Sequence, residues 1–179
     1  MNYYFFILLF ISIISSAQQT VEDDFEGNGT ISTWAGDDCE FDASFSNPYK
    51  TGINTSDTVL KYSDTGGTYA NVFFNTASNF DLSNNRTFSI KIYVSSSDIS
   101  GSQTNQISLK LQDGSLGAPW STQSEIIKTV NLDQWQTITF DFANDSYINL
   151  DSNSPIPINR TDFNRVLLQI NGENNSDTV

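Results

Sequence analysis

The sequence predicts an all-β protein, an antiparallel β-sandwich of the jelly-roll type. Three segments alternate apolar and polar residues with a period of two: Thr87–Val94, Asn105–Gln112 and Trp135–Phe142. This period places one row of side chains in a core and the other row in solvent. Antiparallel sheets with one wet face have this pattern, whereas parallel strands covered by helices do not. No segment after the first seventeen residues has the 3.6-residue period of a helix.

The first part of the chain contains turns and irregular segments. An acidic opening, Val21–Glu26, leads into the turn Gly27-Asn28-Gly29. Thr30–Trp34 is a candidate for a short strand. The following segments, Gly36–Phe45 and the Asn-, Gly- and Ser-containing Ser46–Ser56, are predicted to be irregular.

The rest of the chain contains short strands separated by turns about every ten residues, as a sandwich requires. Thr58–Ser63 and Tyr69–Asn75 are predicted strands, joined by a hairpin-type turn over Asp64-Thr65-Gly66-Gly67. The three alternating strands follow, and Val166–Ile170 is the last predicted strand. The two longer connections contain Gly and Pro and are predicted to lie on the surface: Asp113–Ser124 and Ala143–Asp162.

Residues 1–17 are predicted to be a secretory signal peptide. They are apolar, contain no acidic or basic side chain, and end in small residues before Gln18. The apolar run is about 14 residues long, against the roughly 20 that span a bilayer, so a membrane anchor is the weaker alternative. Residues 18–179 are then one exported domain, extracellular or at the cell surface, and long enough to form its own core.

The C-terminal residues Asn171–Val179 read as a turn followed by the first residues of another strand. A jelly roll pairs its last strand with its first, and a missing last strand leaves a sheet edge unpaired. We therefore expect this chain to be a C-terminally truncated fragment of a longer secreted protein, without its final strand.

Composition excludes several classes of function. The chain has 21 acidic and 8 basic residues and a net charge of −13, which disfavours binding to nucleic acid or anionic lipid. It has no histidine, so Ser-His-Asp and Cys-His catalysis and imidazole-bound zinc sites are excluded. The single cysteine, Cys39, has no partner for an intrachain disulfide. The remaining hydrolytic chemistry is a pair of carboxylates, as in glycosidases.

Several segments, in this order, resemble carbohydrate-binding, galactose-binding-like jelly rolls of secreted flavobacterial proteins. Such modules are attached to polysaccharide-degrading enzymes, for example laminarinases of glycoside hydrolase family 16. The segments are Asp23–Glu26, Asn47–Ser56, Val59–Tyr62, Tyr69–Phe74, Phe80–Ser83, Phe88–Val94, Ile107–Gln112 and Trp135–Phe142. Two features depart from the family: Tyr69-Ala70-Asn71 stands where the family has Trp followed by Ala and Gly, and the closing strand with its pair of aspartates is missing. The resemblance implies a catalytic domain in the same polypeptide.

Sugar-binding proteins use aromatic rings that pack on the apolar face of a pyranose, and polar groups that bind its hydroxyls. The chain has both kinds of side chain at positions predicted to face outward or to lie in loops. Gln169 and Asn171 are predicted to add to the outward row of polar side chains on these strands. If the strands are neighbours, these rows form one groove. The candidate carbohydrate-binding residues are Tyr69, Asn71, Tyr93, Lys110, Gln112, Trp120 and Gln123. For each, simple packing or a solvated strand face is the alternative.

A structural calcium ion is the second expectation. Asp24 and Glu26 lie on one side of an extended segment, and calcium prefers carboxylate and carbonyl oxygens. The resemblance implies a calcium site near the first strand, with Asn47 or Asn54 as further ligands from the Asn-rich loop. The alternative is a solvated acidic terminus.

The sequence therefore predicts a secreted, non-catalytic module that binds a polysaccharide, such as a β-glucan or another algal glycan, and holds an attached enzyme near it. An adhesion or spacer domain without a glycan site is the first alternative. A glycosidase with paired carboxylates is the second, although strand acids such as Asp141 stand alone.

Overall fold

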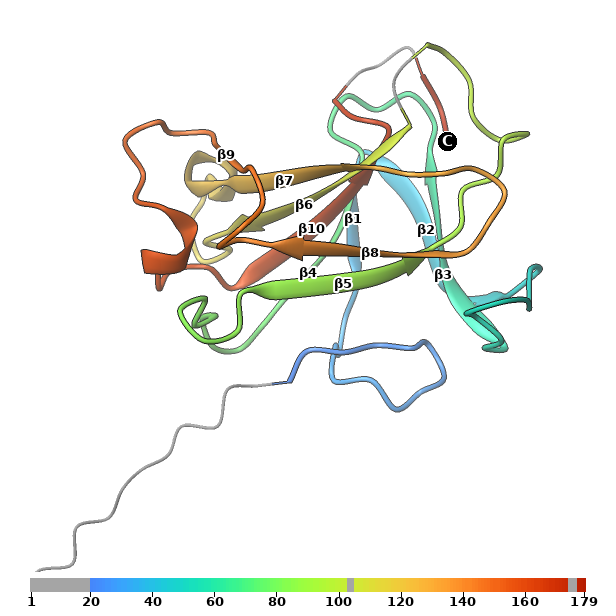
Figure 1. The fold of residues 1–179 in the computed structure, drawn as a ribbon, viewed down its shortest axis with the longest axis horizontal. Coiled ribbons are helices and arrows are strands. Elements are labelled where there is room, and N and C mark those ends of the chain that lie inside the picture. Colours follow the sequence, from blue (N-terminus) through green and yellow to red (C-terminus); the bar gives the residue numbers. More distant parts are fainter. Residues whose placement is uncertain (1–19, 103–104, 174–176) are drawn as a thin grey trace, which may run out of the picture.

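The computed structural model describes residues 20–102, 105–173 and 177–179, and it shows an antiparallel β-sandwich (Figure 1). The predicted signal peptide, residues 1–17, lies outside the described residues. Among the residues described, no helix has the length and apolar character needed to cross a membrane.

Ten strands and two short 3₁₀ helices make up the described fold. The strands are β1 (Ala35–Asp37), β2 (Cys39–Ser46), β3 (Thr58–Asp64), β4 (Asn71–Asn75), β5 (Thr87–Ile92), β6 (Gln106–Gln112), β7 (Ser124–Thr129), β8 (Gln136–Asp141), β9 (Ile148–Asn149) and β10 (Arg165–Ile170). The helices are η1 (Pro119–Thr122) and η2 (Pro157–Asn159). Each helix begins with a proline, whose missing N–H and fixed φ suit the first helical position.

The strands form one large sheet and two hairpin-like pairs. The large sheet has six strands in the order β1-β4-β10-β6-β7-β9, and every neighbouring pair is antiparallel. The pairs β2-β3 and β5-β8 are also antiparallel. In Figure 1, β5 and β8 lie in front of the large sheet, and β2 and β3 lie beside it. The antiparallel sandwich predicted from the sequence is thus confirmed.

The core lies between the large sheet and the strand pairs. Ile107, Leu109 and Leu111 point into it from β6, and they are at most 3% exposed. Phe140 comes from β8 and is fully buried, and Phe142 just after that strand is 1% exposed. The apolar row of each alternating segment therefore supplies the core, as the period of two predicts.

The three alternating segments are strands with bounds shifted by one or two residues, but other predicted elements are wrong. Thr30–Trp34 is not a strand, because pairing begins only at Ala35. Most of Gly36–Phe45, predicted to be irregular, belongs to β1 and β2. Strand β2 pairs with β3 and contains a bulge between Asp42 and Phe45. This bulge breaks the regular ladder.

The C-terminal residues contact the end of β3. The backbone N–H of Asp64 donates to the carbonyl of Val179 at 2.8 Å, and the N–H of Val179 donates to the carbonyl of Asp64 at 3.2 Å. This reciprocal pair is one step of an antiparallel ladder. The N–H of Ser100 donates to the carbonyl of Thr178 at 3.0 Å, so the described end of the chain lies between these two segments.

Candidate functional site

A row of polar side chains crosses the face of the large sheet that is turned away from the core. We call this surface the polar face. Paired residues of neighbouring strands project to the same side, and Gln169 of β10 pairs with Ser108 of β6, while Lys110 of β6 pairs with Glu125 of β7. Val72 of β4 pairs with Leu168 of β10, so the next residues of the two strands, Asn71 and Gln169, lie opposite each other. The register therefore brings together polar residues from four adjacent strands.

Lys110 is the centre of a hydrogen-bond network on the polar face. Its Nζ donates to Oε1 of Gln169 at 2.6 Å and to Oε1 of Glu173 at 2.7 Å, and Oε1 of Glu125 lies 3.9 Å away. The ammonium is therefore surrounded by two carboxylates and one amide oxygen. Its side chain is 2% exposed, so these partners replace the water that a lysine normally keeps.

The network continues toward the turn between β6 and β7. Nε2 of Gln112 donates to Oε1 of Gln123 at 2.8 Å, and Nε2 of Gln123 lies 3.5 Å from Oε2 of Glu125. At the other end, Nε2 of Gln169 donates to the carbonyl of Thr68 at 3.3 Å. The predicted residues Lys110, Gln112 and Gln123 are thus brought together in one connected row.

The polar face is not solvated, and this corrects the expectation from alternation. Lys110, Gln112 and Gln169 lie opposite the core as predicted, but they are only 2%, 4% and 1% exposed. Lys110 bonds to Gln169, Gln112 bonds to Gln123, and Glu173 reaches Lys110 from the segment after β10. The left-handed backbone at Asn171, with φ of 68°, lies between β10 and Glu173.

Two buried polar atoms on the polar face have no hydrogen-bond partner among the residues described: Oδ1 of Asn71 and Oγ of Ser108. Asn71 is 6% exposed and Ser108 is 3% exposed. A buried polar group without a partner costs about 1–3 kcal/mol, so such atoms are normally bonded to protein, water or a ligand. Both atoms are closed off from solvent in this conformation.

Exposed aromatic residues adjoin both ends of the row. Tyr69 directly follows Thr68, which bonds to Gln169, and its side chain is 58% exposed. Trp120 lies in η1, and its carbonyl accepts the N–H of Gln123 at 3.0 Å. Trp120 is also 58% exposed. Tyr69 and Asn71 do not share a strand face as predicted, because β4 begins only at Asn71.

Tyr93 belongs to a different part of the molecule, so the expectation of a single groove is wrong for this residue. It follows β5, which pairs with β8 and not with the large sheet. The Tyr93 ring stacks on Tyr49 with 4.1 Å between centroids, and it lies 5.8 Å from Trp135. The indole N–H of Trp135 donates to the carbonyl of Tyr49 at 2.7 Å, which fixes this cluster.

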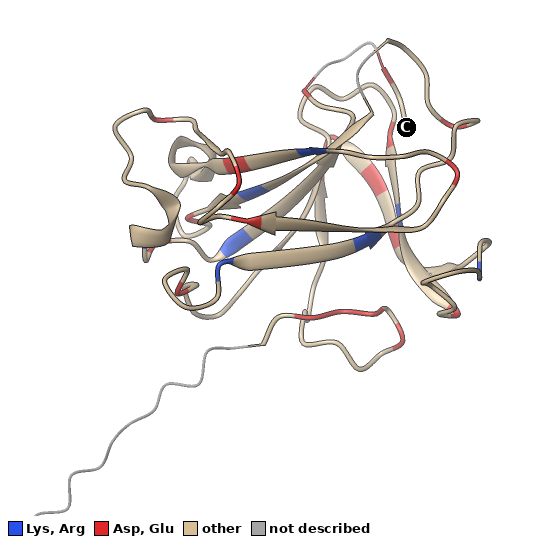
Figure 2. Ribbon diagram, in the orientation of Figure 1, with Lys and Arg blue, Asp and Glu red and all other residues tan. Residues whose placement is uncertain are grey.

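Three of the four predicted calcium ligands, Glu26, Asn47 and Asn54, bond to the same short segment, Ser56–Thr58. Oε1 of Glu26 accepts the N–H of Thr58 at 2.8 Å, and the amide oxygens of Asn47 and Asn54 each accept a backbone N–H two residues later. Asp24 instead lines a pocket of about 240 Å³ with Glu22, Asp23, Asn28 and Gly29. In Figure 2 this N-terminal loop is a conspicuous acidic segment. Within the described ranges, no three His, Cys, Asp or Glu residues are arranged to hold a metal ion.

The groups considered for catalysis are poorly suited to it. Burial raises the pKa of the Cys39 thiol to about 11, so the thiol is protonated at neutral pH. The pKa of Asp141 is lowered, chiefly because the Asn144 side chain donates to its carboxylate at 2.7 Å. A glycosidase general acid needs the opposite shift, toward the protonated form.

Sequence reasoning missed three groups at this site. Glu125 lies in β7, inside a segment with no assigned strand, and Glu173 lies after the last predicted strand. The third group is apolar. Ile148 of β9 pairs with Glu125 and is 55% exposed, and Ile127 is 42% exposed two residues after Glu125. These isoleucines give the polar face an apolar margin. The adjacent pair Ile126-Ile127 interrupts the alternation, which hid this strand from the pattern.

The comparisons with known proteins agree with this architecture. A family model described as "Carbohydrate binding domain" matches residues 17–150. The crystal structure of an agarase, AgWH50C, superposes with a TM-score of 0.51 at 11% sequence identity. The match covers 89% of this chain and 23% of the agarase chain, so the likeness concerns the fold of about a quarter of that protein. No curated protein matches the chain. Because the family model covers well over half of the sequence, the chain belongs to this family of carbohydrate binding domains.

Proposed function

We propose that this domain is a non-catalytic module that binds a polysaccharide along the polar face, between Tyr69 and Trp120. The observation that carries the proposal is a connected row of buried amide and charged side chains with exposed aromatic side chains near both ends. Aromatic rings suit the apolar face of a pyranose, and amides suit its hydroxyl groups.

We infer that the domain is secreted or held at the cell surface and tethers a glycoside hydrolase in the same polypeptide to its substrate, a β-glucan or another algal glycan. Tethering raises the local concentration of substrate without a change in the chemical step. The net charge of −13 favours a neutral polymer over a strongly anionic one.

Affinity electrophoresis tests the proposal directly. Residues 18–179 are run through gels that contain laminarin, agarose or alginate, and we expect one of the two neutral polymers, laminarin or agarose, to retard the wild-type protein and anionic alginate not to do so. We expect Trp120→Ala to weaken binding about 30-fold, which corresponds to roughly 2 kcal/mol for the loss of an aromatic ring that packs on a sugar. Trp120 is exposed, so its replacement leaves the core intact.

Tyr49→Ala is the matched control, because Tyr49 is an exposed aromatic residue of the cluster around Tyr93. It is expected to bind like the wild type. Retardation by none of the polymers would favour the spacer alternative. Normal binding by Trp120→Ala together with loss of binding by Tyr49→Ala would place the glycan on the other cluster.

Calcium binding stays a separate proposal, centred on Asp24 and the acidic loop around it. If calcium binds the folded state with its concentration at about 100 times the dissociation constant, the midpoint of thermal unfolding rises by about 8 °C relative to EDTA. Asp24→Asn should remove this rise, whereas Glu40→Gln, an exposed acid on β2, should keep it. An identical midpoint in calcium and EDTA would contradict the proposal.

A further inference from the structure

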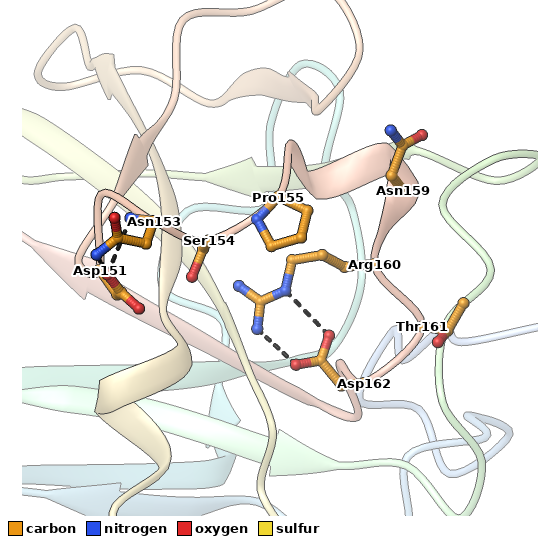
Figure 3. Close-up of a pocket in the computed structure, with 8 residues that line it drawn as sticks. All are labelled: Asp151, Asn153, Ser154, Pro155, Asn159, Arg160, Thr161 and Asp162. Carbon is orange, nitrogen blue, oxygen red and sulfur yellow. Dashed lines mark hydrogen bonds and ion pairs between the residues drawn. The ribbon is translucent and has the colours of Figure 1, made fainter.

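An open pocket of about 450 Å³ lies where the loop after β9 meets the segment between η2 and β10 (Figure 3). Asp151, Asn153 and Ser154 line it from the first segment, Asn159 lines it from the end of η2, and Thr161 and Asp162 line it from the second segment. It is a shallow depression that is open to solvent, so a molecule bound there would lie on the surface. None of these residues belongs to the polar face described above.

The pocket offers oxygen atoms and amides but no available cation. Arg160 also lines it, but its guanidinium is engaged: Nε and Nη2 donate to the two carboxylate oxygens of Asp162 at 3.0 and 2.5 Å, and Nη1 donates to the carbonyl of Thr122 at 2.6 Å. Figure 3 shows the paired Arg160 and Asp162 with Ser154 beside them. With Asp151 and Asp162 on its walls, the pocket disfavours anions and suits a neutral molecule rich in hydroxyl groups.

The pocket is joined to the Trp120 end of the polar face. The bond from Arg160 to Thr122 connects it to η1, and the N–H of Leu150 donates to the carbonyl of Gln123 at 3.0 Å. Leu150 immediately precedes Asp151, and its side chain is 59% exposed. Exposed apolar side chains at Trp120 and Leu150 therefore lie along the path from Gln123 to the pocket.

We propose that this pocket is a distal subsite that binds an additional uncharged sugar unit of a chain already held on the polar face. The inference rests on the proposed function, because the polymer reaches the pocket past Trp120. Short oligosaccharides are then expected to fill only the polar face, and longer ones also to contact Ser154, Asn159 and Thr161.

Titration calorimetry with oligosaccharides of increasing length tests the subsite. The probes are β-1,3-gluco-oligosaccharides or agaro-oligosaccharides of two to eight sugar units, the series being that of the polymer that retards the wild-type protein. In the double variant Asn159→Ala/Thr161→Ala, we expect unchanged affinity for the shortest binding oligosaccharide. For the longest, we expect about a tenfold loss, equivalent to one or two hydrogen bonds.

Two further variants make the result decisive. Ser154→Leu fills the pocket and should reproduce the length-dependent loss, and Asn85→Ala/Thr139→Ala, an equal change at exposed positions elsewhere, should have no effect. Equal affinity of the double variant and wild type for every length would overturn the subsite while leaving the proposed function standing. An equal loss at every length would also overturn it, because the pocket would then be part of the primary site. Failure of the wild type to bind any glycan would instead overturn the proposed function, and the subsite with it.

Discussion

Replacing Lys110 by methionine is expected to lower the free energy of unfolding by about 3 kcal/mol, because breaking a buried ion pair leaves its partners uncompensated. Methionine keeps most of the volume of the side chain but removes the ammonium. Oε1 of Gln169 then loses its donor, and Glu125, whose side chain is 13% exposed, loses the nearest positive charge. For a domain of this size, the expected fall in the midpoint of thermal unfolding is about 10 °C.

Lys128→Met is the matched control for this prediction. Lys128 lies on the neighbouring strand β7 and pairs with Asp145 at 2.6 Å, but its side chain is 31% exposed and that of Asp145 is 25% exposed. A pair that remains in contact with solvent contributes at most about 1 kcal/mol. Urea unfolding of both variants therefore shows whether the loss in free energy of unfolding comes from the burial of Lys110 or only from the loss of an ion pair.

A second substitution tests the cause of the expected loss at Lys110. Glu125→Gln in the Lys110→Met background removes the carboxylate left without a cation, and part of the lost stability should return. The double-mutant cycle gives the coupling free energy between the two residues. A decrease below 1 kcal/mol for Lys110→Met, or no recovery in the double variant, would show that the network is not what stabilises the polar face.

The network at Lys110 illustrates how much of the site could be predicted from the sequence. Alternation in Asn105–Gln112 is enough to place Lys110 and Gln112 opposite the core, and the structure agrees. Burial of these residues could not be predicted in the same way. It depends on Glu173, which reaches Lys110 after the positive φ at Asn171, and on Gln123, which approaches from the turn between β6 and β7. Such contacts arise from tertiary structure and leave no periodic signal.

The strands also divide into those that can be predicted from the sequence and those that cannot. Strands β5, β6 and β8 can be predicted because apolar and polar residues alternate along each of them. Strand β7 has buried Ile126 beside exposed Ile127 near the margin of the sheet, so its pattern is mixed. Strand β9 has only two residues, and its pairing with β7 defines it. A strand that is defined only by its pairing with a neighbouring strand cannot be recognised from its own sequence.

Replacing Arg160 by alanine is the second change with a large expected effect, a loss of about 3 kcal/mol in the free energy of unfolding. The Arg160 side chain is 6% exposed, donates to Asp162 and to the carbonyl of Thr122, and lies 4.0 Å above the ring of Phe163. The substitution removes charge-assisted hydrogen bonds and the packing of the aliphatic stem together. Arg160→Lys keeps the charge but not the two-point contact with Asp162, so its loss should be intermediate.

Arg86→Ala is the control, since Arg86 is 45% exposed and its Nε lies 3.9 Å from the carboxylate of Asp141. Its expected effect is below about 1 kcal/mol. If Arg160→Ala and Arg86→Ala destabilise the protein equally, Arg160 does not hold the loops around the pocket in place.

The pH dependence of the stability lost in Arg160→Ala shows how much of this loss comes from the ion pair between Arg160 and Asp162. Burial raises the pKa of this carboxyl, but the hydrogen bonds and charge of Arg160 outweigh burial, so the pKa is lowered in the folded protein. An acid with a lowered pKa stabilises the folded state above its unfolded pKa of about 3.9, and this contribution disappears as the pH falls through the folded value. The difference between wild type and Arg160→Ala should therefore be constant from pH 5 to 7 and shrink below about pH 4. A difference that does not change down to pH 2 would assign the whole effect to Thr122 and Phe163.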